Sequence, residues 1–151
     1  MAAKTRAIEI VEKAGVTFSV HEYRHDAGAA YGLEAAEKLG VDPARVFKTL
    51  VVDVDGKPLM AIVPVESELD LRALGKRAAM ATPAAAERLT GYVTGGISPL
   101  GQRRALPTLL DGSALAFETI YVSGGRRGLE IELAAADLAT LTRAAVRPLA
   151  R

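Results

Sequence analysis

The segment from residue 46 to residue 63 limits the possible folds of this chain more than any other. Val46 to Val54 is rich in β-branched and apolar residues, Asp55-Gly56 is a pair typical of tight hairpin turns, and Pro58 to Val63 has the composition of a returning strand. We therefore predict an antiparallel hairpin, which places this part of the chain in a β-sheet.

Helix and strand patterns are mixed along the rest of the chain. Apolar residues at helical spacing predict a first helix that ends at Gly15. The later predicted helices are 31–39, 69–79, 83–89 and 134–145, and Asp42-Pro43 suits the N-cap and first position of another. The other predicted strands are 16–23, 107–110, 117–122 and 129–133. Because successive strands are joined by short turns, we predict an α+β fold with a mostly antiparallel or barrel-like mixed sheet flanked by helices.

Length and composition favour a single compact domain over residues 1–151. Of 151 residues, 50% are hydrophobic and 25% are charged, which suits one domain with a core. The start is amphipathic, unlike a secretion signal, and no apolar run reaches the roughly 20 residues that cross a bilayer. Cysteine is absent, which excludes disulfides, thiolate nucleophiles and the usual structural zinc sites. We expect a cytoplasmic protein with no membrane partner, no metal and no other cofactor.

The charge is nearly balanced, so any contact with nucleic acid must be local. The 19 basic and 18 acidic side chains leave a formal net charge of +1. Short basic clusters occur at Arg72, Lys76 and Arg77, at Arg103 and Arg104, and at Arg126 and Arg127. Taken alone, each cluster is better explained as solvated surface charge.

Lys48 points to a site because of its place in the hairpin. Strand alternation puts it on one face with Val46, Leu50 and Val52, and that face is apolar. An ammonium group there must pair, reach solvent or line a cleft, since an unpaired charge in a dry interior is costly. The alternative is an edge-strand lysine that blocks aggregation, and the pattern favours neither interpretation.

Two glycine-rich segments can bring backbone N–H groups close to a ligand. Residues 95–101 do not have the spacing of a phosphate loop or a dinucleotide motif, but their glycines suit a developing negative charge. Residues 123–128 combine glycines with two arginines, which suits a phosphate or ribose. They precede a strand on which Glu130 and Glu132 face away from the apolar side. An ordinary turn would explain either segment by itself.

The two histidines, His21 and His25, flank Tyr23 and raise the question of a metal or a catalytic base. A metal is disfavoured because no cysteine can contribute and no H-E-x-x-H pattern is present. A Ser-His-Asp enzyme is disfavoured because the chain has no G-x-S-x-G motif. We expect the histidines to lie at the surface or to support other groups.

Taken together, these segments resemble one family. The resemblance is carried by residues 46–50 (Val-Phe-Lys-Thr-Leu), 90–101 (Thr-Gly-Tyr-Val-Thr-Gly-Gly-Ile-Ser-Pro-Leu-Gly) and 119–130 (Thr-Ile-Tyr-Val-Ser-Gly-Gly-Arg-Arg-Gly-Leu-Glu), with His21 to Asp26 upstream. In this order and spacing, which cover nearly the whole chain, the sequence resembles the YbaK/EbsC family of tRNA deacylases. The resemblance implies an α+β fold related to the editing insertion domain of bacterial prolyl-tRNA synthetases, here free-standing.

The resemblance also implies which residues form the site. Lys48 corresponds to the essential lysine of the family, and the positions that line its pocket are Tyr23, Tyr31, Thr49, Gly95 and Ser123. Glu130 stands where the best-known branch has aspartate, and Tyr31 stands where that branch has phenylalanine. We expect the N–H groups of Gly95 and Gly96 to hold the substrate carbonyl oxygen. Contacts with tRNA are expected from Arg103, Arg104, Arg126 and Arg127.

The implied reaction is release of the amino acid from mischarged tRNA, with cysteinyl-tRNA(Pro), and also cysteinyl-tRNA(Cys), as substrates and prolyl-tRNA synthetase as partner. The thiol of a cysteinyl ester is a strong nucleophile, so we expect it to attack its own carbonyl. Two alternatives remain open. The chain can act on another ester such as alanyl-tRNA(Pro), or it can be a non-catalytic module that binds tRNA or a synthetase.

Overall fold

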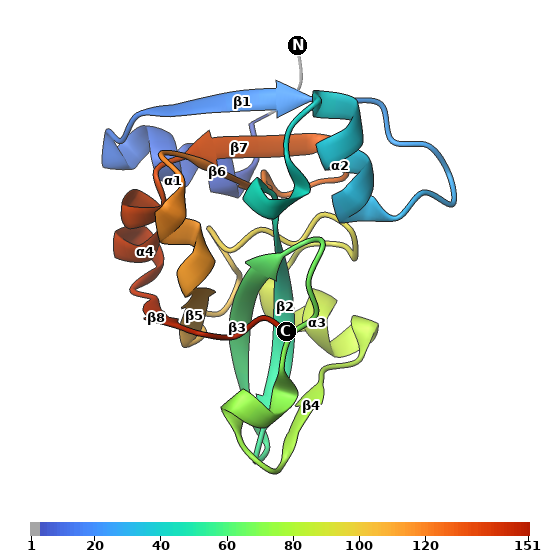
Figure 1. The fold of residues 1–151 in the computed structure, drawn as a ribbon, viewed down its shortest axis with the longest axis vertical. Helices are drawn as coiled ribbons and strands as arrows, with labels where there is room; N and C mark the ends of the chain where they lie inside the picture. The colour runs from blue at the N-terminus through green and yellow to red at the C-terminus, as the bar shows by residue number, and fades with distance from the viewer. Residues whose placement is uncertain (1–3) are drawn as a thin grey trace.

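The predicted hairpin lies at the centre of a five-stranded sheet in the computed structural model, which describes residues 4–151 (Figure 1). In sheet order its strands are β4 (Ala78–Met80), β2 (Phe47–Val54), β3 (Lys57–Pro64), β5 (Thr108–Asp111) and β8 (Ala145–Arg147). Strand β2 pairs antiparallel with β3 and β4, whereas β3–β5 and β5–β8 are parallel pairs. This sheet is therefore mixed.

A second sheet of three antiparallel strands lies against the start of β2. Its order is β1 (Phe18–Glu22), β7 (Leu129–Leu133) and β6 (Ile120–Ser123). A parallel bridge between Val46 and Tyr121 joins it to the larger sheet. Figure 1 shows β1 and β7 crossing the top of the molecule while β2 and β3 run down from them. Side chains from both sheets therefore meet where β2 begins.

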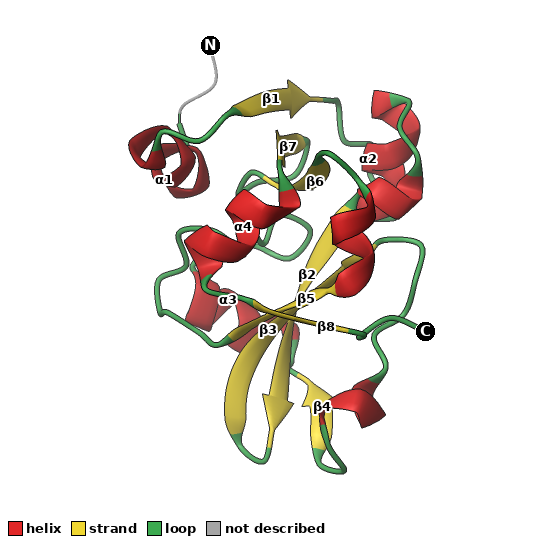
Figure 2. Cartoon of the chain, turned by 60° about the vertical axis from the view of Figure 1, so that its left-hand side comes forward, coloured by secondary structure: helices red, strands yellow, loops and turns green. Residues whose placement is uncertain are grey.

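Helices cover the small sheet from two sides. Helices α1 (Arg6–Ala14) and α4 (Ala135–Thr142) lie on one side, and α2 (Tyr31–Leu39) lies on the other (Figures 1 and 2). The remaining helical segments are α3 (Pro83–Thr90) and the 3-10 turns Pro43–Arg45, Leu71–Leu74 and Gly112–Ala116. None of the helices within residues 4–151 is long and apolar enough to span a lipid bilayer.

The main core fills the space between α1, α4 and both sheets. Its fully buried members include Val11, Ile62, Leu110, Ile131 and Leu138. A second apolar cluster packs on the other face of the large sheet, around Val52, Val63 and Leu149. Because the large sheet is covered on both faces, β2 has apolar residues on both of its faces: Phe47 packs in the main core and Val52 in the second cluster.

Two predicted helices are wrong or too long. Residues 69–79 form a short 3-10 turn that ends at Gly75, which has φ 133°, and then strand β4, which pairs with Val52–Val54. Strand pairing overrides the helix propensity of the alanines here. The closing helix stops at Thr142 because Arg143 adopts a left-handed conformation with φ 57°, and the next residues form β8 beside β5. The other predicted helices and strands are confirmed to within a few residues.

Candidate functional site

A cavity of about 350 Å³ lies between β2, the loop before Ile97, the ends of β6 and β7, and helix α2. Such a volume falls at the lower end of the range of roughly 300–1,000 Å³ found for small-molecule sites. Six residues singled out from the sequence line it, namely Tyr23, Lys48, Thr49, Gly95, Ser123 and Glu130. Residues more than 100 positions apart in the chain therefore share one small space.

Lys48 lies on β2 opposite Val63 and is partly buried. Its strand neighbours Leu50 and Val52 pack into the apolar cluster behind the sheet, as expected from the alternation. Burial lowers the pKa of the Lys48 amine, and the charge of Glu68 opposes this effect. Within residues 4–151 the amine forms neither a hydrogen bond nor an ion pair. A cation without a fixed partner at a cavity wall is available to a ligand.

Thr49 contributes a buried hydroxyl to the same wall. The residue is only 8% exposed, and its Oγ1 has no hydrogen-bond partner among the described residues. A buried hydroxyl left unpaired costs about 1–3 kcal/mol. Such a group is normally satisfied by water or by a ligand, and here it lines a cavity.

Glu130 contributes a buried carboxyl from the small sheet. It is 7% exposed, lies between His21 on β1 and Ser123 on β6 in the strand register, and lines the cavity. Burial raises the pKa of this carboxyl from its ordinary value of 4.5 to about 8. Within the part of the chain that the structure describes, it has no hydrogen-bond or ion-pair partner. Its burial against the cavity makes it a second polar group ready for a ligand.

Tyr23 and Ser123 complete the polar part of the wall. The Tyr23 N–H donates to the Gly128 carbonyl at 2.9 Å, which fixes the end of β1 against the second glycine-rich segment. Burial, helped by the charges of Glu130 and Glu34, raises the pKa of the Tyr23 hydroxyl to about 12. The Ser123 Oγ accepts a hydrogen bond from the Gly125 N–H at 3.2 Å. Tyr23 is therefore a neutral hydrogen-bonding group across the physiological pH range.

The two glycine-rich segments pack directly on each other. A side chain at Gly96 would place its Cβ 2.7 Å from the Cα of Arg126, so this position requires glycine. Gly95 reaches the cavity, and within residues 4–151 its N–H donates no hydrogen bond. Gly96 corrects one expectation: it is buried, and its N–H donates to the Val93 carbonyl at 2.9 Å. Of these two N–H groups, that of Gly95 is the one left without an acceptor among residues 4–151.

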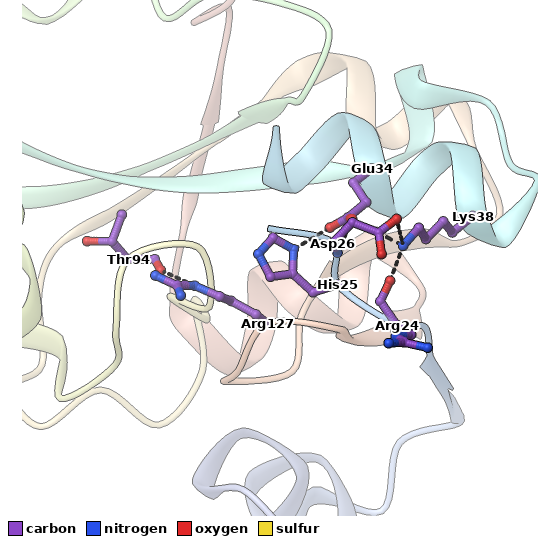
Figure 3. Close-up of polar contacts among 7 residues, drawn as sticks. All are labelled: Arg24, His25, Asp26, Glu34, Lys38, Thr94 and Arg127. Atoms are coloured by element: carbon purple, nitrogen blue, oxygen red, sulfur yellow. Dashed lines mark hydrogen bonds and ion pairs between the residues drawn. The ribbon is translucent and has the colours of Figure 1, made fainter. Parts of the chain in front are cut away.

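A network of polar contacts holds helix α2 over the cavity (Figure 3). The buried Glu34 carboxylate accepts from the Asp26 N–H at 2.7 Å and contacts His25 at 2.5 Å and Lys38 at 3.2 Å. Burial opposes ionisation, but these hydrogen bonds lower the pKa of Glu34 to about 2. Lys38 also pairs with Asp26 and donates to the Arg24 carbonyl. His21 pairs with Glu132 at 2.9 Å, so both histidines support other groups.

The four arginines expected to contact tRNA differ in their surroundings. Arg104 lines an open groove beside the cavity. The Arg127 Nε donates to the Thr94 carbonyl at 2.9 Å (Figure 3), and Arg126 lies 3.8 Å from Glu22. Arg103 is exposed and packs near Gly91. Tyr31 begins α2, and its side chain lies outside the part of the chain that the structure describes.

Several cavity residues were not expected from the sequence. They include Gly32 on α2, which packs so closely on Val65 that an added Cβ would lie 2.4 Å from its Cγ1. Others are Met80, the last residue of the missed strand β4, and Ala81, which follows it. A glycine in the first turn of a helix is unusual enough to signal a close contact, whereas nothing in the local pattern singles out Met80 or Ala81.

No described group of three or more histidine, aspartate or glutamate side chains is placed to hold a metal ion. The fold and site thus define an α+β domain with a mainly apolar cavity, lined by an amine, a hydroxyl and a carboxyl that have no partner among the residues the structure describes. Such a cavity can bind a small ligand that has both an anionic or ester end and a cationic end.

Comparisons with known proteins agree with this class. The model of the aminoacyl-tRNA editing domain family matches residues 27–141. A protein of Enterococcus faecalis, named for Cys-tRNA(Pro)/Cys-tRNA(Cys) deacylation (EbsC), is 37% identical over 146 residues, covering 92% of this chain and 88% of that protein. A proline–tRNA ligase of Acidithiobacillus ferrooxidans is 36% identical over 87 residues, which are 54% of this chain and 15% of the ligase.

A solved structure, named as a trans-editing enzyme for prolyl-tRNA synthetase, has the same fold. It superposes with a TM-score of 0.84 at 28% identity, covering 97% of this chain and 95% of that one. The chain therefore belongs to the aminoacyl-tRNA editing domain family, in its YbaK/EbsC branch. By this membership it is an aminoacyl-tRNA editing enzyme, related to the editing domains of prolyl-tRNA synthetases.

Proposed function

We propose that this protein releases cysteine from mischarged cysteinyl-tRNA(Pro), and also from cysteinyl-tRNA(Cys), as a free-standing cytoplasmic deacylase built from residues 1–151. The observation that carries the proposal is the set of unpartnered groups around one cavity: the Lys48 amine, the Thr49 hydroxyl and the Glu130 carboxyl. The name of the Enterococcus relative supports cysteine as the amino acid.

In the proposed complex, Glu130 faces the α-ammonium group of the substrate. The cation would stabilise the ionised form of this buried carboxyl and supply its missing partner. The Thr49 hydroxyl and the Ser123 hydroxyl are placed to bond the ribose or the ester oxygen. The glutamate side chain is one methylene group longer than the aspartate of the best-known branch, which would change the depth of the cavity or the pairing of this carboxylate.

Chemistry in this site needs no protein nucleophile, because an aminoacyl ester is already activated. The substrate sulfur attacks its own carbonyl carbon, a C–S bond forms, the ester C–O bond breaks, and the proton lost by the thiol ends on the departing ribose oxygen. The products are tRNA with a free 3′ end and a cysteine thiolactone. The Lys48 cation would stabilise the negative charge on the thiolate and the ester, and the Gly95 N–H would donate to the carbonyl oxygen.

Replacement of Lys48 by alanine tests the proposal directly. We expect single-turnover release of cysteine to slow by roughly 100-fold or more, as for loss of one transition-state contact. The melting temperature should change little, because Lys48 has no fixed partner within residues 4–151. Lys13→Ala, at an exposed position of α1, is the matched control. Near-normal release by Lys48→Ala would refute the assignment.

A panel of esters separates the alternatives. We expect cysteine to be released from tRNA(Pro) much faster than serine, because serine offers a weaker nucleophile in a side chain of nearly the same shape. Rapid release of serine would show that thiol assistance is unnecessary. Faster release from alanyl-tRNA(Pro) would show that alanine, and not cysteine, is the preferred amino acid. Inactivity on all three esters would favour a non-catalytic binding module.

We further propose that tRNA identity is supplied by prolyl-tRNA synthetase. The net charge of +1 gives the domain little attraction for a polyanion on its own. The ligase relative carries a matching segment of 87 residues within its own chain, which supports an ancestral link between the two activities. Addition of the synthetase should raise the rate of release at sub-saturating tRNA.

A further inference from the structure

Beside the cavity lies an open groove of about 730 Å³ that no step of the proposed reaction uses. It runs between the turn of the β2–β3 hairpin, strand β4 and helix α3, which lie in the lower half of Figure 1. Met80 and Ala81 line both the groove and the cavity, so the two spaces adjoin at these residues. A chain-like ligand that leaves the cavity here would enter the groove.

The groove carries three arginines that converge from separate parts of the chain. Arg77 precedes β4, Arg88 lies on α3, and Arg104 follows the first glycine-rich segment. The guanidinium groups of Arg88 and Arg104 form no ion pair or hydrogen bond with any residue from 4 to 151. Asp53 and Asp55 also border the groove, and Asp55 lies 3.8 Å from Arg77. Two of the three cations are thus free for an external anion.

The end of the cavity nearest this groove is apolar. Met80 and Ala81 border the groove, and Ala81 packs with Ala86 and Ile97 in one apolar cluster. The carboxyl of Glu130 comes instead from the small sheet. The chain from Val46 through the first residues of β2 to Val51 lines the cavity, a path of roughly 17 Å at the usual rise of a strand. This path is longer than a cysteinyl group alone and leaves the apolar end for a flat, weakly polar group such as a nucleobase.

These observations point to one orientation of the substrate. We propose that the terminal adenosine occupies the apolar end of the cavity, and that the preceding phosphodiesters of the tRNA acceptor end lie in the groove against Arg88 and Arg104. This inference rests on the proposed function for the identity of the ligand. The proposal names Arg88 and Arg104 as the two phosphate contacts. Guanidinium groups bind phosphate well, and such contacts make the affinity depend on salt.

The test compares two substrates that differ in their phosphates. Cysteinyl-tRNA(Pro) has the whole acceptor end, whereas 3′-O-cysteinyl-adenosine has the ester and base but no phosphodiester. For the variant R88A/R104A we expect kcat/KM on the tRNA to fall roughly tenfold, with a salt dependence shallower by roughly 1 to 2 in log–log slope. On cysteinyl-adenosine the same variant should match the unmodified protein.

The control variant is K13A/R24A, which removes the same charge at exposed positions outside the groove. An equal fall in this control, an equal loss on both substrates, or an unchanged kcat/KM on tRNA would overturn the inference. If the unmodified protein cleaves neither substrate, the proposed function fails instead. The groove is then tested by titration with deacylated tRNA at low salt, where R88A/R104A should bind more weakly than K13A/R24A, and equal binding overturns it.

Discussion

At the scale of single residues, the same polar groups that can bind a ligand in the cavity lower the stability of the free protein. Thr49 and Glu130 are both more than nine-tenths buried, and both lack partners within residues 4–151. Such groups lower the stability of the free protein, and a ligand that supplies their partners recovers the loss. Replacements that remove the polarity should therefore raise stability and lower activity together.

Thr49→Val separates these two effects at a single hydroxyl. The replacement keeps the shape and removes the unpaired oxygen, so we expect the free energy of unfolding to rise by about 1 kcal/mol. Single-turnover release of cysteine should become slower. Urea denaturation and a quenched-flow assay measure the two quantities. Thr49→Ser, which keeps the hydroxyl, should retain activity without the gain in stability. A loss of stability in Thr49→Val would show that the hydroxyl already has a partner.

Glu130→Gln should change how stability depends on pH. The pKa of Glu130 is raised by burial to about 8 in the folded protein, from an ordinary 4.5. Below pH 4.5 both states bind the proton, so the group costs nothing; between pH 4.5 and 8 the unfolded state loses the proton first, and stability falls. The variant has no carboxyl at this position to ionise, so its free energy of unfolding does not fall for this reason. At pH 8.5 we expect it to exceed the original protein by roughly 1–4 kcal/mol, since one pKa unit is about 1.4 kcal/mol.

Urea denaturation at pH 5 and at pH 8.5 measures this difference. Glu118→Gln, at an exposed position before β6, should leave stability nearly unchanged at both values. The release of cysteine by Glu130→Gln should be slow at either pH, because the α-ammonium group loses its counter-charge. A constant difference between pH 5 and pH 8.5 would contradict the assignment of a buried, protonated carboxyl.

At the scale of elements, the contact between the two glycine-rich segments sets the shape of the cavity wall. Gly96→Ala would push its Cβ into the backbone of Arg126, which must shift because the separation would be 2.7 Å. We expect a destabilisation of roughly 1–3 kcal/mol, typical of an overpacked site, and slower cysteine release. Gly112→Ala is the control, because its Cβ would meet nothing closer than 4.0 Å. Equal effects of the two substitutions on melting temperature and activity would contradict this account.

The elements that could be predicted from the sequence are those with strong local signals. The β2–β3 hairpin is set by Asp55-Gly56, and α3 begins at Thr82 and Pro83, an N-cap followed by a favoured first residue. Strands β4 and β8 have three residues each and form only because β2 and β5 offer them an edge. Local patterns contain no information about such pairing, so these two strands were missed.

The candidate site also contains some features that the sequence predicts and others that it does not. Lys48 drew attention because a charge interrupts an apolar strand, and the glycines did so because they cluster. The burial of Glu130 depends on β1 and β6 pairing on either side of β7, which the sequence does not reveal. The turn in which the Gly96 N–H donates to the Val93 carbonyl could not be predicted either. Resemblance to a family named residues that line the cavity, whereas the structure separates the groups without partners among residues 4–151 from those already engaged.

At the scale of the whole molecule, charge balance makes the domain a weak binder of tRNA by itself. With a net charge of +1, we expect a Kd for deacylated tRNA weaker than roughly 10⁻⁶ M at physiological salt. Fluorescence anisotropy with labelled tRNA(Pro) measures this affinity. A tRNA of another identity should bind as weakly as tRNA(Pro) when no synthetase is present. Tight, selective binding by the isolated protein would show that it reads tRNA identity without a partner.

The bridge between Val46 and Tyr121 has a consequence for how such proteins diverge. It joins the sheet that carries Lys48 to the sheet that carries Glu130, so the amine and the carboxyl belong to separate halves of the framework. A small substitution at Tyr121, which does not line the cavity, would tilt one half against the other and resize the cavity while every lining residue stays the same. Relatives with identical linings can thereby come to prefer different amino acids.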